Sequence, residues 1–379
     1  MARPLSEDEV LGLIDALAPG EWQSGEALAA EAGVTRAALA KRVAHLREWG
    51  LQVEAEAGRG YRLAQPLQRL DAARIRAALP ATAQQRLRSV EVLARTDSTN
   101  QRLLEADAAA DPQALFAELQ TAGRGRRGRE WRSPFGANLY LSLGWSFPAW
   151  PPQLSALSLA VGVACARALR KAGLRQVMLK WPNDLRVGED KLGGILIEQR
   201  GEAGGVCRVV IGIGINVAMS AEQAGVLGQP WTSLQAALEA SRDSSKTSFA
   251  PSESRSDSYL QSSPEGAEHL LMSRVGREAT RIEGGASASL DRNALAAGLL
   301  AELIAALTEF ESAGFAPFLH DWSTLDATAN QPVRIEGGGE PLQGIARGVD
   351  AQGALIVEAQ GHRHHVHAGE VSLRFGGNA

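Results

Sequence analysis

The chain has 379 residues, which at roughly 150 residues per domain indicates two or three domains. Hydrophobic residues make up 45% and charged residues 22%, a balance typical of a folded globular protein and not of a disordered one. A formal net charge of -4 excludes a polycation that coats nucleic acid, so any nucleic-acid contact has to come from a local basic patch.

Two further features bear on the cellular compartment. The isolated Cys165 and Cys207 argue against a disulfide framework and against a cysteine-ligated zinc site. The first ten residues are acidic and lack an apolar segment, and the uncharged stretch at 155–166 is too short to span a bilayer. We therefore expect a soluble, cytoplasmic protein with no membrane partner.

Residues 1–65 are predicted to form three short helices followed by a hairpin. Ser6 and Glu9 have the spacing of a capping box for the first helix. Thr35 can cap the third helix after a short turn at Gly33, and this is the spacing of a helix-turn-helix. A glycine-flanked hairpin follows as a wing. The pattern predicts a winged helix-turn-helix domain.

Charges are unevenly placed within residues 1–65. The segment has 7 Lys/Arg and 10 Asp/Glu, a net of -3, which argues against DNA binding. Six of these cations nevertheless fall on the third helix or the wing, where phosphate contacts would be made. We predict a DNA-binding domain, and a module used only for packing or dimerisation stays open. The predicted DNA-contacting residues are Thr35, Arg36, Lys41, Arg42, Arg47 and Arg59.

Beyond a linker at Pro66 the chain mixes strand-like and helical segments up to about residue 328. The predicted strands are 90–93, 115–119, 139–143, 177–180, 194–198 and 209–213, and the predicted helices are 154–169 and 295–310. This irregular mixture favours an α+β fold with a mixed central domain over residues 66–328.

A serine-rich segment interrupts this central domain. Ten of the 25 residues in 241–265 are serine and aliphatic side chains are nearly absent, so burial cannot offset the entropy of ordering. We expect a flexible, inert surface insertion over about 241–289.

The last part of the chain, residues 329–379, alternates short strands with glycine turns. The predicted strands are 333–335, 344–347, 354–358, 364–366 and 371–375, and together they indicate a small SH3-like barrel. Four histidines between 362 and 367 alternate across the two faces of a strand, which favours a solvated strand over a metal site.

The glycine-rich loop 123–128 formally satisfies G-x-G-x-x-G, but no amphipathic helix follows it and no acid stands about 20 residues on to hold a ribose. The loop and its flank instead carry the arginines Arg124, Arg126, Arg127, Arg129 and Arg132 against the single acid Glu130. These cations repel one another unless a multiply charged anion binds, and guanidinium forks suit carboxylate or phosphate. An arginine-rich nucleic-acid loop is the alternative.

Two other motifs end predicted strands. Lys180 offers a point charge that could neutralise charge developing at phosphorus, while Asn183 and Asp184 can hydrogen-bond or hold Mg²⁺. In the third motif, 212–216, glycines would let a nucleobase or ribose approach closely. Each motif by itself is a weak signal.

In their order and spacing these motifs resemble the family of bifunctional biotin–protein ligases and biotin operon repressors. The motifs that carry the resemblance are Thr96–Asn100, Gln120–Arg129, Ser133–Tyr140, Lys180–Asp184, Lys191–Gly194, Gly212–Asn216 and Gly344–Asp350. The resemblance covers nearly the whole chain, and related lipoate ligases lack the arginine-rich loop and the Lys-Trp-Pro-Asn-Asp motif. The serine-rich insertion departs from the family pattern, but it lies beyond the catalytic motifs.

The resemblance implies a class II synthetase-like catalytic domain that makes biotinyl-5′-AMP from biotin and MgATP. Biotin then passes to a lysine of the biotin carboxyl carrier protein of acetyl-CoA carboxylase. The resemblance implies three catalytic residues, Lys180, Arg124 and Arg126. The biotin-binding residues that it implies are Ser98, Thr99, Asn100, Gln120, Arg124, Gly125, Arg126 and Lys180. The ATP- or adenylate-binding residues that it implies are Arg127, Arg129, Trp131, Asn183, Lys191, Asn216 and Trp231. Mg²⁺ would be carried by ATP, and no protein ligands are assigned to it.

The resemblance also implies a homodimer that forms on binding biotinyl-5′-AMP and then binds the operator DNA of the biotin operon. Two alternatives stay open. One is a transcription factor whose ligase domain only senses a small ligand, and the other is a ligase whose N-terminal module is vestigial.

Overall fold

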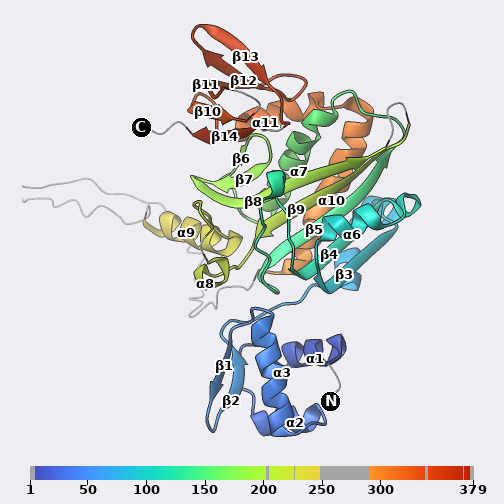
Figure 1. Ribbon diagram of the computed structural model, residues 1–379, viewed down its shortest axis with the longest axis vertical. Helices are drawn as coiled ribbons and strands as arrows, with labels where there is room; N and C mark the ends of the chain where they lie inside the picture. The colour runs from blue at the N-terminus through green and yellow to red at the C-terminus, as the bar shows by residue number, and fades with distance from the viewer. Residues whose placement is uncertain are drawn as a thin grey trace, which may run out of the picture.

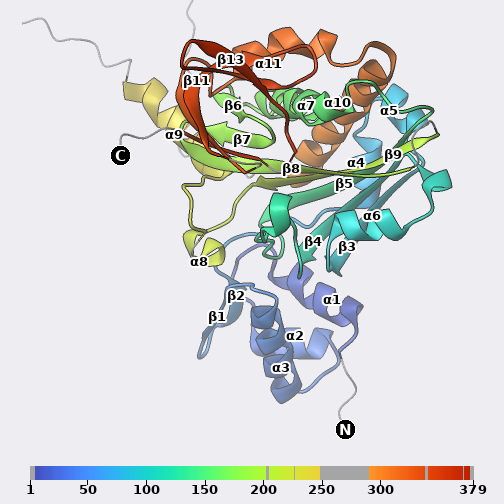
Figure 2. The same cartoon turned by 45° about the horizontal axis from the view of Figure 1, so that its top comes forward.

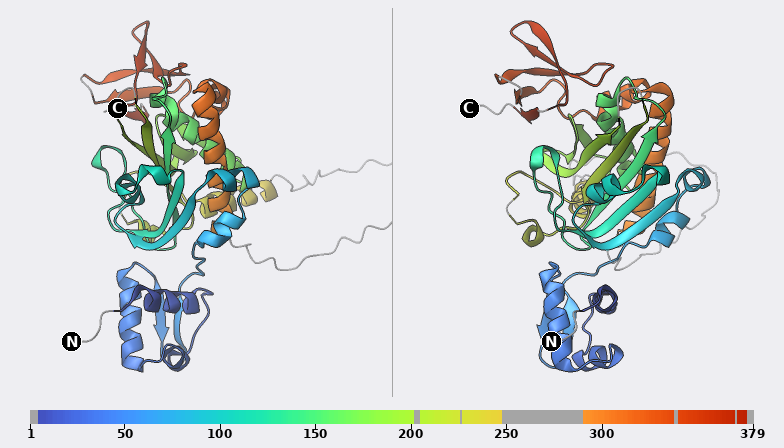
Figure 3. Two further views of the ribbon diagram at one scale, coloured as in Figure 1. Left: turned by 90° about the vertical axis from the view of Figure 1, so that its right-hand side faces the viewer. Right: turned by 45° about the vertical axis from the view of Figure 1, so that its right-hand side comes forward.

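The computed structural model describes residues 5–201, 205–225, 227–247, 290–337, 340–369 and 371–375. Within them the chain forms three separate sheets in three successive parts of the sequence. The N-terminal module lies at one end of the molecule and the C-terminal sheet at the other, with the central sheet between them (Figure 1, Figure 3). The predicted α+β class is confirmed.

Three helices and an antiparallel hairpin make up the N-terminal module. They are α1 Glu7–Leu17, α2 Gly25–Glu31, α3 Arg36–Glu48, β1 Val53–Glu56 and β2 Gly60–Leu63. Ser6 forms the predicted capping box with Glu9, and the Thr35 side chain accepts a main-chain N–H from the first turn of α3. Gly60 has a φ of 105°, and a Cβ there would lie 1.9 Å from the carbonyl oxygen of Gln23, so the hairpin needs glycine to pack beside α2. The winged helix-turn-helix prediction is confirmed.

A seven-stranded sheet with the order β3-β4-β5-β9-β8-β7-β6 forms the centre of the molecule. Its strands are β3 Ser89–Thr96, β4 Gln113–Gln120, β5 Asn138–Phe147, β6 Val177–Lys180, β7 Asp184–Val187, β8 Asp190–Arg200 and β9 Cys207–Asn216. Only β3 and β4 run parallel, and every other neighbouring pair is antiparallel. The six predicted strands are present, and β7 is the addition, since four residues beside a turn give no clear alternation.

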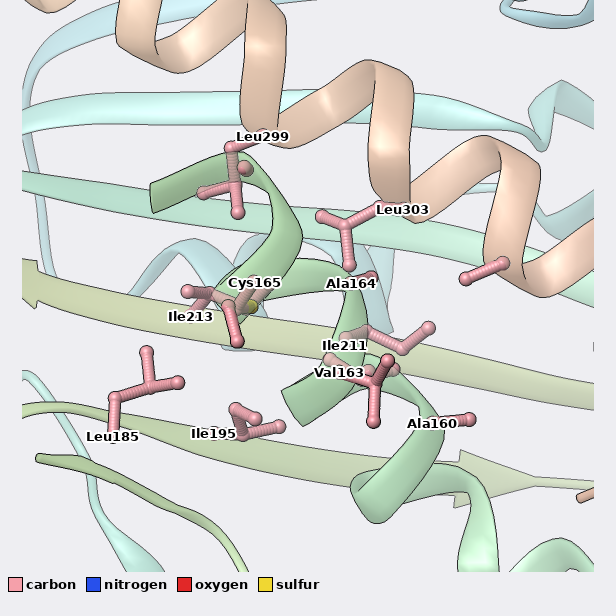
Figure 4. Packing of buried hydrophobic residues seen from close by; sticks show 14 of the residues in the cluster. Ala160, Val163, Ala164, Cys165, Leu185, Ile195, Ile211, Ile213, Leu299 and Leu303 are labelled. Atoms are coloured by element: carbon pink, nitrogen blue, oxygen red, sulfur yellow. The ribbon is translucent and has the colours of Figure 1, made fainter. Parts of the chain in front are cut away.

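Two apolar helices, α7 Leu157–Lys171 and α10 Arg292–Ala313, pack against each other and cover one face of this sheet. In Figure 4, Ala164 and Cys165 of α7 lie near Leu299 and Leu303 of α10, and all four belong to one apolar cluster with the buried residues of the sheet. The short helix α6, Thr99–Glu105, covers the opposite face, as Figure 2 shows. Among the described residues α10 alone is long and apolar enough to cross a membrane, but 61% of its apolar window is buried, as in a core helix.

The remaining helices of the central part are short. They are α4 Ala72–Ala77, α5 Ala81–Arg86, α8 Ala221–Ala224, α9 Leu234–Thr247 and α11 Leu319–Leu325. Helix α9 corrects one prediction, because residues 241–247 belong to it and not to a flexible insertion. Leu234 and Ala237 bury the start of α9 in the core, and the helix continues past them into the polar sequence. The rest of the predicted insertion, residues 248–289, lies outside the described residues.

Five antiparallel strands in the order β13-β12-β11-β10-β14 form the C-terminal sheet. Their bounds are β10 Pro332–Glu336, β11 Leu342–Val349, β12 Leu355–Ala359, β13 His362–Val366 and β14 Ser372–Phe375. Their buried side chains join the apolar core of the central sheet. Trp181 also donates its indole N–H to the carbonyl of Gly353 at 3.2 Å, so the two sheets are held together by both packing and hydrogen bonding.

The N-terminal module contacts the central domain through an aromatic pair, and a buried ion pair of the central domain holds the linker that follows the module. The ring of Trp49 lies 5.5 Å from the ring of Phe135. Arg292 donates to the carbonyl of Gln68 in the linker at 2.6 Å and pairs with Glu118 at 2.9 Å. Both side chains of this ion pair are almost fully buried, so the linker depends on a charge that has little access to water.

We expect Glu118→Ala to lower the free energy of unfolding by about 3–5 kcal/mol, because it leaves the buried guanidinium of Arg292 without its carboxylate. Denaturant unfolding measures the difference. Glu26→Ala is the control, since it removes an ion pair with Arg36 whose side chains are 77% and 74% exposed and should change stability little. A loss for Glu118→Ala no larger than that of the control would contradict the assignment.

Candidate functional site

One pocket between the central sheet and the C-terminal sheet brings together most of the residues singled out in the sequence. All of the residues predicted for the biotin pocket line it: Ser98, Thr99, Asn100, Gln120, Arg124, Gly125, Arg126 and Lys180. Residues predicted for the adenylate also line it, namely Arg127, Arg129, Trp131, Asn183 and Lys191. Segments that are far apart in the chain therefore meet around a single space.

A network of neutral polar side chains forms one wall of this pocket. Gln120 Oε1 accepts hydrogen bonds from the main-chain N–H and the hydroxyl of Thr99 at 2.9 and 3.1 Å. Asn100 accepts from the hydroxyl of Ser142 at 2.5 Å, and its amide nitrogen donates to Glu198 at 2.9 Å. Buried groups held in this way present fixed donors and acceptors, which suits a small neutral polar ligand group such as an amide.

The glycines at the end of β9 make room for protein side chains. A Cβ on Gly212 would lie 2.3 Å from Asn100 Oδ1, and a Cβ on Gly214 would lie 2.5 Å from the ring of Trp131. Asn100 and Trp131 lie against these glycines, which also line the pocket, and the approach of a nucleobase or ribose to them stays a prediction. The ammonium of Lys191 lies 5.6 Å from the centroid of the Trp131 ring, a distance at which the ring attracts the positive charge.

The arginine loop is held by acceptors on both sides of the pocket. Arg124 donates to Glu198 at 3.0 Å. Arg126 donates to two main-chain carbonyls between β13 and β14, at 2.6 and 2.7 Å, and Arg127 donates to the hydroxyl of Ser372. Protein groups thus relieve part of the mutual repulsion that the sequence predicts, and the loop joins the central sheet to the C-terminal sheet.

Lys180 stands at the end of β6 among other positive charges. Burial is the largest cause that lowers the pKa of Lys180, to about 8, and nearby cations lower it further, while Asp184 acts in the opposite direction. The ammonium lies 5.0 Å from the centroid of the Phe375 ring. A site that disfavours its own positive charge in this way gains stability when an anion binds.

Sequence reasoning missed the contribution of β14 to the pocket. Residues 371–374 line it, including the cation Arg374, although no local motif marks them. Asn216 and Trp231 lie outside the lining. Asn216 is buried and donates to the carbonyl of Thr232 at 3.1 Å, and the roles of both residues at an adenylate stay predictions.

The positions considered for Mg²⁺ are engaged with protein groups. Asp184 pairs with Lys191 at 2.7 Å. The amide of Asn183 accepts from Arg126 at 3.3 Å and donates to the carbonyl of Ile195 at 2.7 Å. In the described part of the chain no group of three His, Cys, Asp or Glu side chains could hold a metal ion, and this includes the histidines of β13.

On the predicted DNA-contacting face, α3 cations are paired with acids from other helices. Arg42 is buried and pairs with Glu9 of α1 at 2.7 Å, so we withdraw it as a DNA contact. Arg36 pairs at the surface with Glu26 of α2 at 2.6 Å. The fold brings these acids from α1 and α2 to the cations of α3, and the sequence of α3 gives no sign of that pairing. Lys41 is exposed on the same helix.

The predicted DNA-contacting residues on the wing and at the two ends of α3 also contact other groups of the module. Arg59 pairs with Glu56 at 3.0 Å and its guanidinium lies 4.5 Å from the centroid of the Trp22 ring. Arg47 donates to the main-chain carbonyl of Val53 at 2.8 Å, which ties α3 to the first strand of the wing. Thr35 caps α3 at its N-terminus.

Comparison with known proteins agrees with this architecture. Residues 92–216 match the biotin/lipoate A/B protein ligase family, 328–374 match the biotin protein ligase C-terminal domain, and 18–62 match a helix-turn-helix domain. The bifunctional ligase/repressor BirA of Escherichia coli is 40% identical over 96% of this chain and 97% of its own length. The biotin–[acetyl-CoA-carboxylase] ligase of Mycobacterium tuberculosis is 31% identical over 75% of this chain and 88% of its own.

Solved structures agree at the level of the fold. The biotin protein ligase from Aquifex aeolicus in complex with biotin and ATP has a TM-score of 0.54 and 23% identity, covering 76% of this chain and 99% of that one. A helix-turn-helix module joined to a ligase domain with its own C-terminal sheet defines a bifunctional class of protein. The chain belongs to the family of bifunctional biotin–protein ligase/repressors.

We expect the Lys180 amine to titrate near pH 8, so that its ammonium form is present below that pH and is lost above it. Asp184→Asn removes a carboxylate that raises this pKa, so the midpoint should move lower still. Competitive acetylation of the amines as a function of pH, read peptide by peptide, measures both midpoints. A midpoint at or above the ordinary lysine value in the unmodified chain would show that the ammonium is not destabilised.

Proposed function

We propose that the protein activates biotin with ATP to biotinyl-5′-AMP and transfers biotin to a lysine of the biotin carboxyl carrier protein of acetyl-CoA carboxylase. The observation that carries this proposal is one pocket in which a neutral hydrogen-bonding network adjoins a cluster of cations. The network of Thr99, Asn100 and Gln120 suits the ureido ring of biotin, which offers two N–H donors and one carbonyl. The cations suit the valerate carboxylate and the α-phosphate of ATP.

The first half-reaction makes the greater demand on these cations. When the carboxylate attacks the α-phosphate, negative charge builds on the pentavalent phosphorus, and Lys180, Arg124 and Arg126 would stabilise it. Binding of that charge would also hold Lys180 in its ammonium form. In the second half-reaction the carrier amine attacks the acyl carbon and AMP leaves with the electron pair, so no pentavalent phosphorus forms and the cations act only on the charge that the departing phosphate oxygen gains. Mg²⁺ would enter with the ATP phosphates.

Lys180→Gln is expected to slow formation of biotinyl-5′-AMP by about 100-fold or more, because it removes a charge aimed at the transition state. Transfer from supplied biotinyl-5′-AMP to a carrier domain should fall by much less. Release of pyrophosphate reports the first half-reaction, and an avidin blot of the carrier reports the second.

Lys171→Gln is the matched control, since Lys171 is an exposed lysine on α7 that pairs with Glu302 and does not line the pocket. Equal losses in both half-reactions for Lys180→Gln would assign Lys180 to ligand binding. A folded protein that makes no adenylate and labels no carrier would refute the ligase proposal itself.

We further propose that biotinyl-5′-AMP strengthens a homodimer, which binds the operator of the biotin synthesis genes and represses them in the cytoplasm. The contact between Trp49 and Phe135 supports a link between ligand and DNA. Trp49 follows α3, and Phe135 follows the arginine loop that lines the pocket. The buried, unpaired Cys165 and Cys207 are compatible with a reducing cytosol.

Operator DNA should bind weakly without biotinyl-5′-AMP and more tightly with it, because a dimer doubles the number of phosphate contacts. Lys41→Ala should weaken binding and lower its salt dependence, whereas Glu26→Gln should strengthen binding by releasing Arg36. Sedimentation followed by footprinting, each with and without the adenylate, tests this. Identical DNA affinity in both conditions would favour a vestigial module and leave the ligase proposal intact.

A further inference from the structure

Lysine is rare in this chain, whereas arginine is not. The chain contains 39 Lys and Arg residues in all, and its lysines are Lys41, Lys171, Lys180, Lys191 and Lys246. The two side chains carry the same charge, but only lysine has an amine that can lose its proton and act as a nucleophile under physiological conditions. The choice between them has chemical consequences in a protein that holds an activated acyl group.

The cations around the pocket are mainly arginines. They are Arg124, Arg126, Arg127, Arg129 and Arg374. The pocket also contains two lysines, and each amine is covered by a neighbouring group. Lys191 pairs with Asp184 at 2.7 Å, and Lys180 lies 5.0 Å from the centroid of the Phe375 ring.

We propose that this arrangement protects the chain from acylating itself. Guanidinium groups supply positive charge at the pocket without offering a nucleophile, and each of the two amines inside has a group beside it, a carboxylate for Lys191 and an aromatic ring for Lys180. The proposal rests on the proposed function, since it requires an acyl adenylate in the pocket. In the reaction avoided, a lysine nitrogen bonds to the acyl carbon as the bond to the phosphate oxygen breaks, AMP leaves with the electron pair, and the ammonium proton passes to water.

Of the two amines in the pocket, that of Lys180 is the one more easily made nucleophilic. In the ligand-free pocket its pKa is lowered to about 8, so this amine gives up its proton more readily than an exposed lysine, and the neutral amine is the nucleophilic form. The ring of Phe375 lies on one side of it, and Arg186 also stacks on that ring, at 5.0 Å from the centroid.

Glu130 offers a matched test at the edge of the pocket. Its side chain is 72% exposed, it lines the pocket, and it has no role in the proposed chemistry. Glu130→Lys and Glu130→Arg change the charge equally, but only the first introduces an amine. With biotin and MgATP and no carrier, Glu130→Lys should take up biotin at position 130 at least ten times faster than any native lysine does. Glu130→Arg should show no such increase in its total biotin.

Peptide mapping by mass spectrometry locates the biotin, and the exposed Lys41 and Lys171 report acylation by adenylate that has diffused away from the pocket.

A second variant tests whether the partner of a native amine protects that amine. Asp184→Asn removes the carboxylate partner of Lys191 and should produce biotin on Lys191 that the unmodified chain does not carry.

Parallel reactions started with synthetic biotinyl-5′-AMP separate this inference from the ligase proposal, since they need no adenylation step. Labelling at position 130 no greater than at Lys171, with the adenylate supplied, would overturn the inference whatever the ligase result. Failure of the unmodified protein to make adenylate from biotin and MgATP would count against the proposed function alone.

Discussion

Positive charge is concentrated at one pocket of this protein, and both neighbouring sheets supply groups that balance it. Five arginines and two lysines line a space that also holds a buried neutral network. Such a cluster is unfavourable in a folded chain unless acceptors are placed around it, and the lowered pKa of Lys180 is a direct expression of that cost. The protein meets the demand with carboxylates, carbonyl groups and aromatic rings drawn from distant parts of the sequence.

Meeting that demand makes the C-terminal sheet part of the site. Arg126 and Arg127 find acceptors near β14, and Phe375 of the same strand covers Lys180. These contacts require the C-terminal sheet to be fixed against the central one, which a shared apolar core and the bond from Trp181 to Gly353 achieve. Loosening the C-terminal sheet would therefore alter the electrostatics of the pocket as well as its shape.

The N-terminal module manages its charge in a different way. Its cations are balanced within the module, by Glu9 and Glu26 from other helices and by Glu56 on the wing itself. Phosphates would have to compete with these acids for the cations, which disfavours tight binding of DNA by a single module. Its residue Trp49 contacts Phe135, which follows the arginine loop in the sequence.

Local patterns in the sequence were enough to predict most helices and strands and the positive charge of the arginine loop. Capping residues, apolar alternation and clustered arginines act over a few neighbouring positions, so the helices of the winged module, six central strands and the cations of the loop were all predictable. Tertiary structure alone decided which charges meet. Arg42 pairs with Glu9, and Arg124 donates a hydrogen bond to Glu198. Residues of β14 line the pocket, and Asn100 and Trp131 pack against two glycines of β9. Each of these pairs joins residues far apart in the chain, and long-range contacts leave no periodic signal in the sequence for local rules to detect.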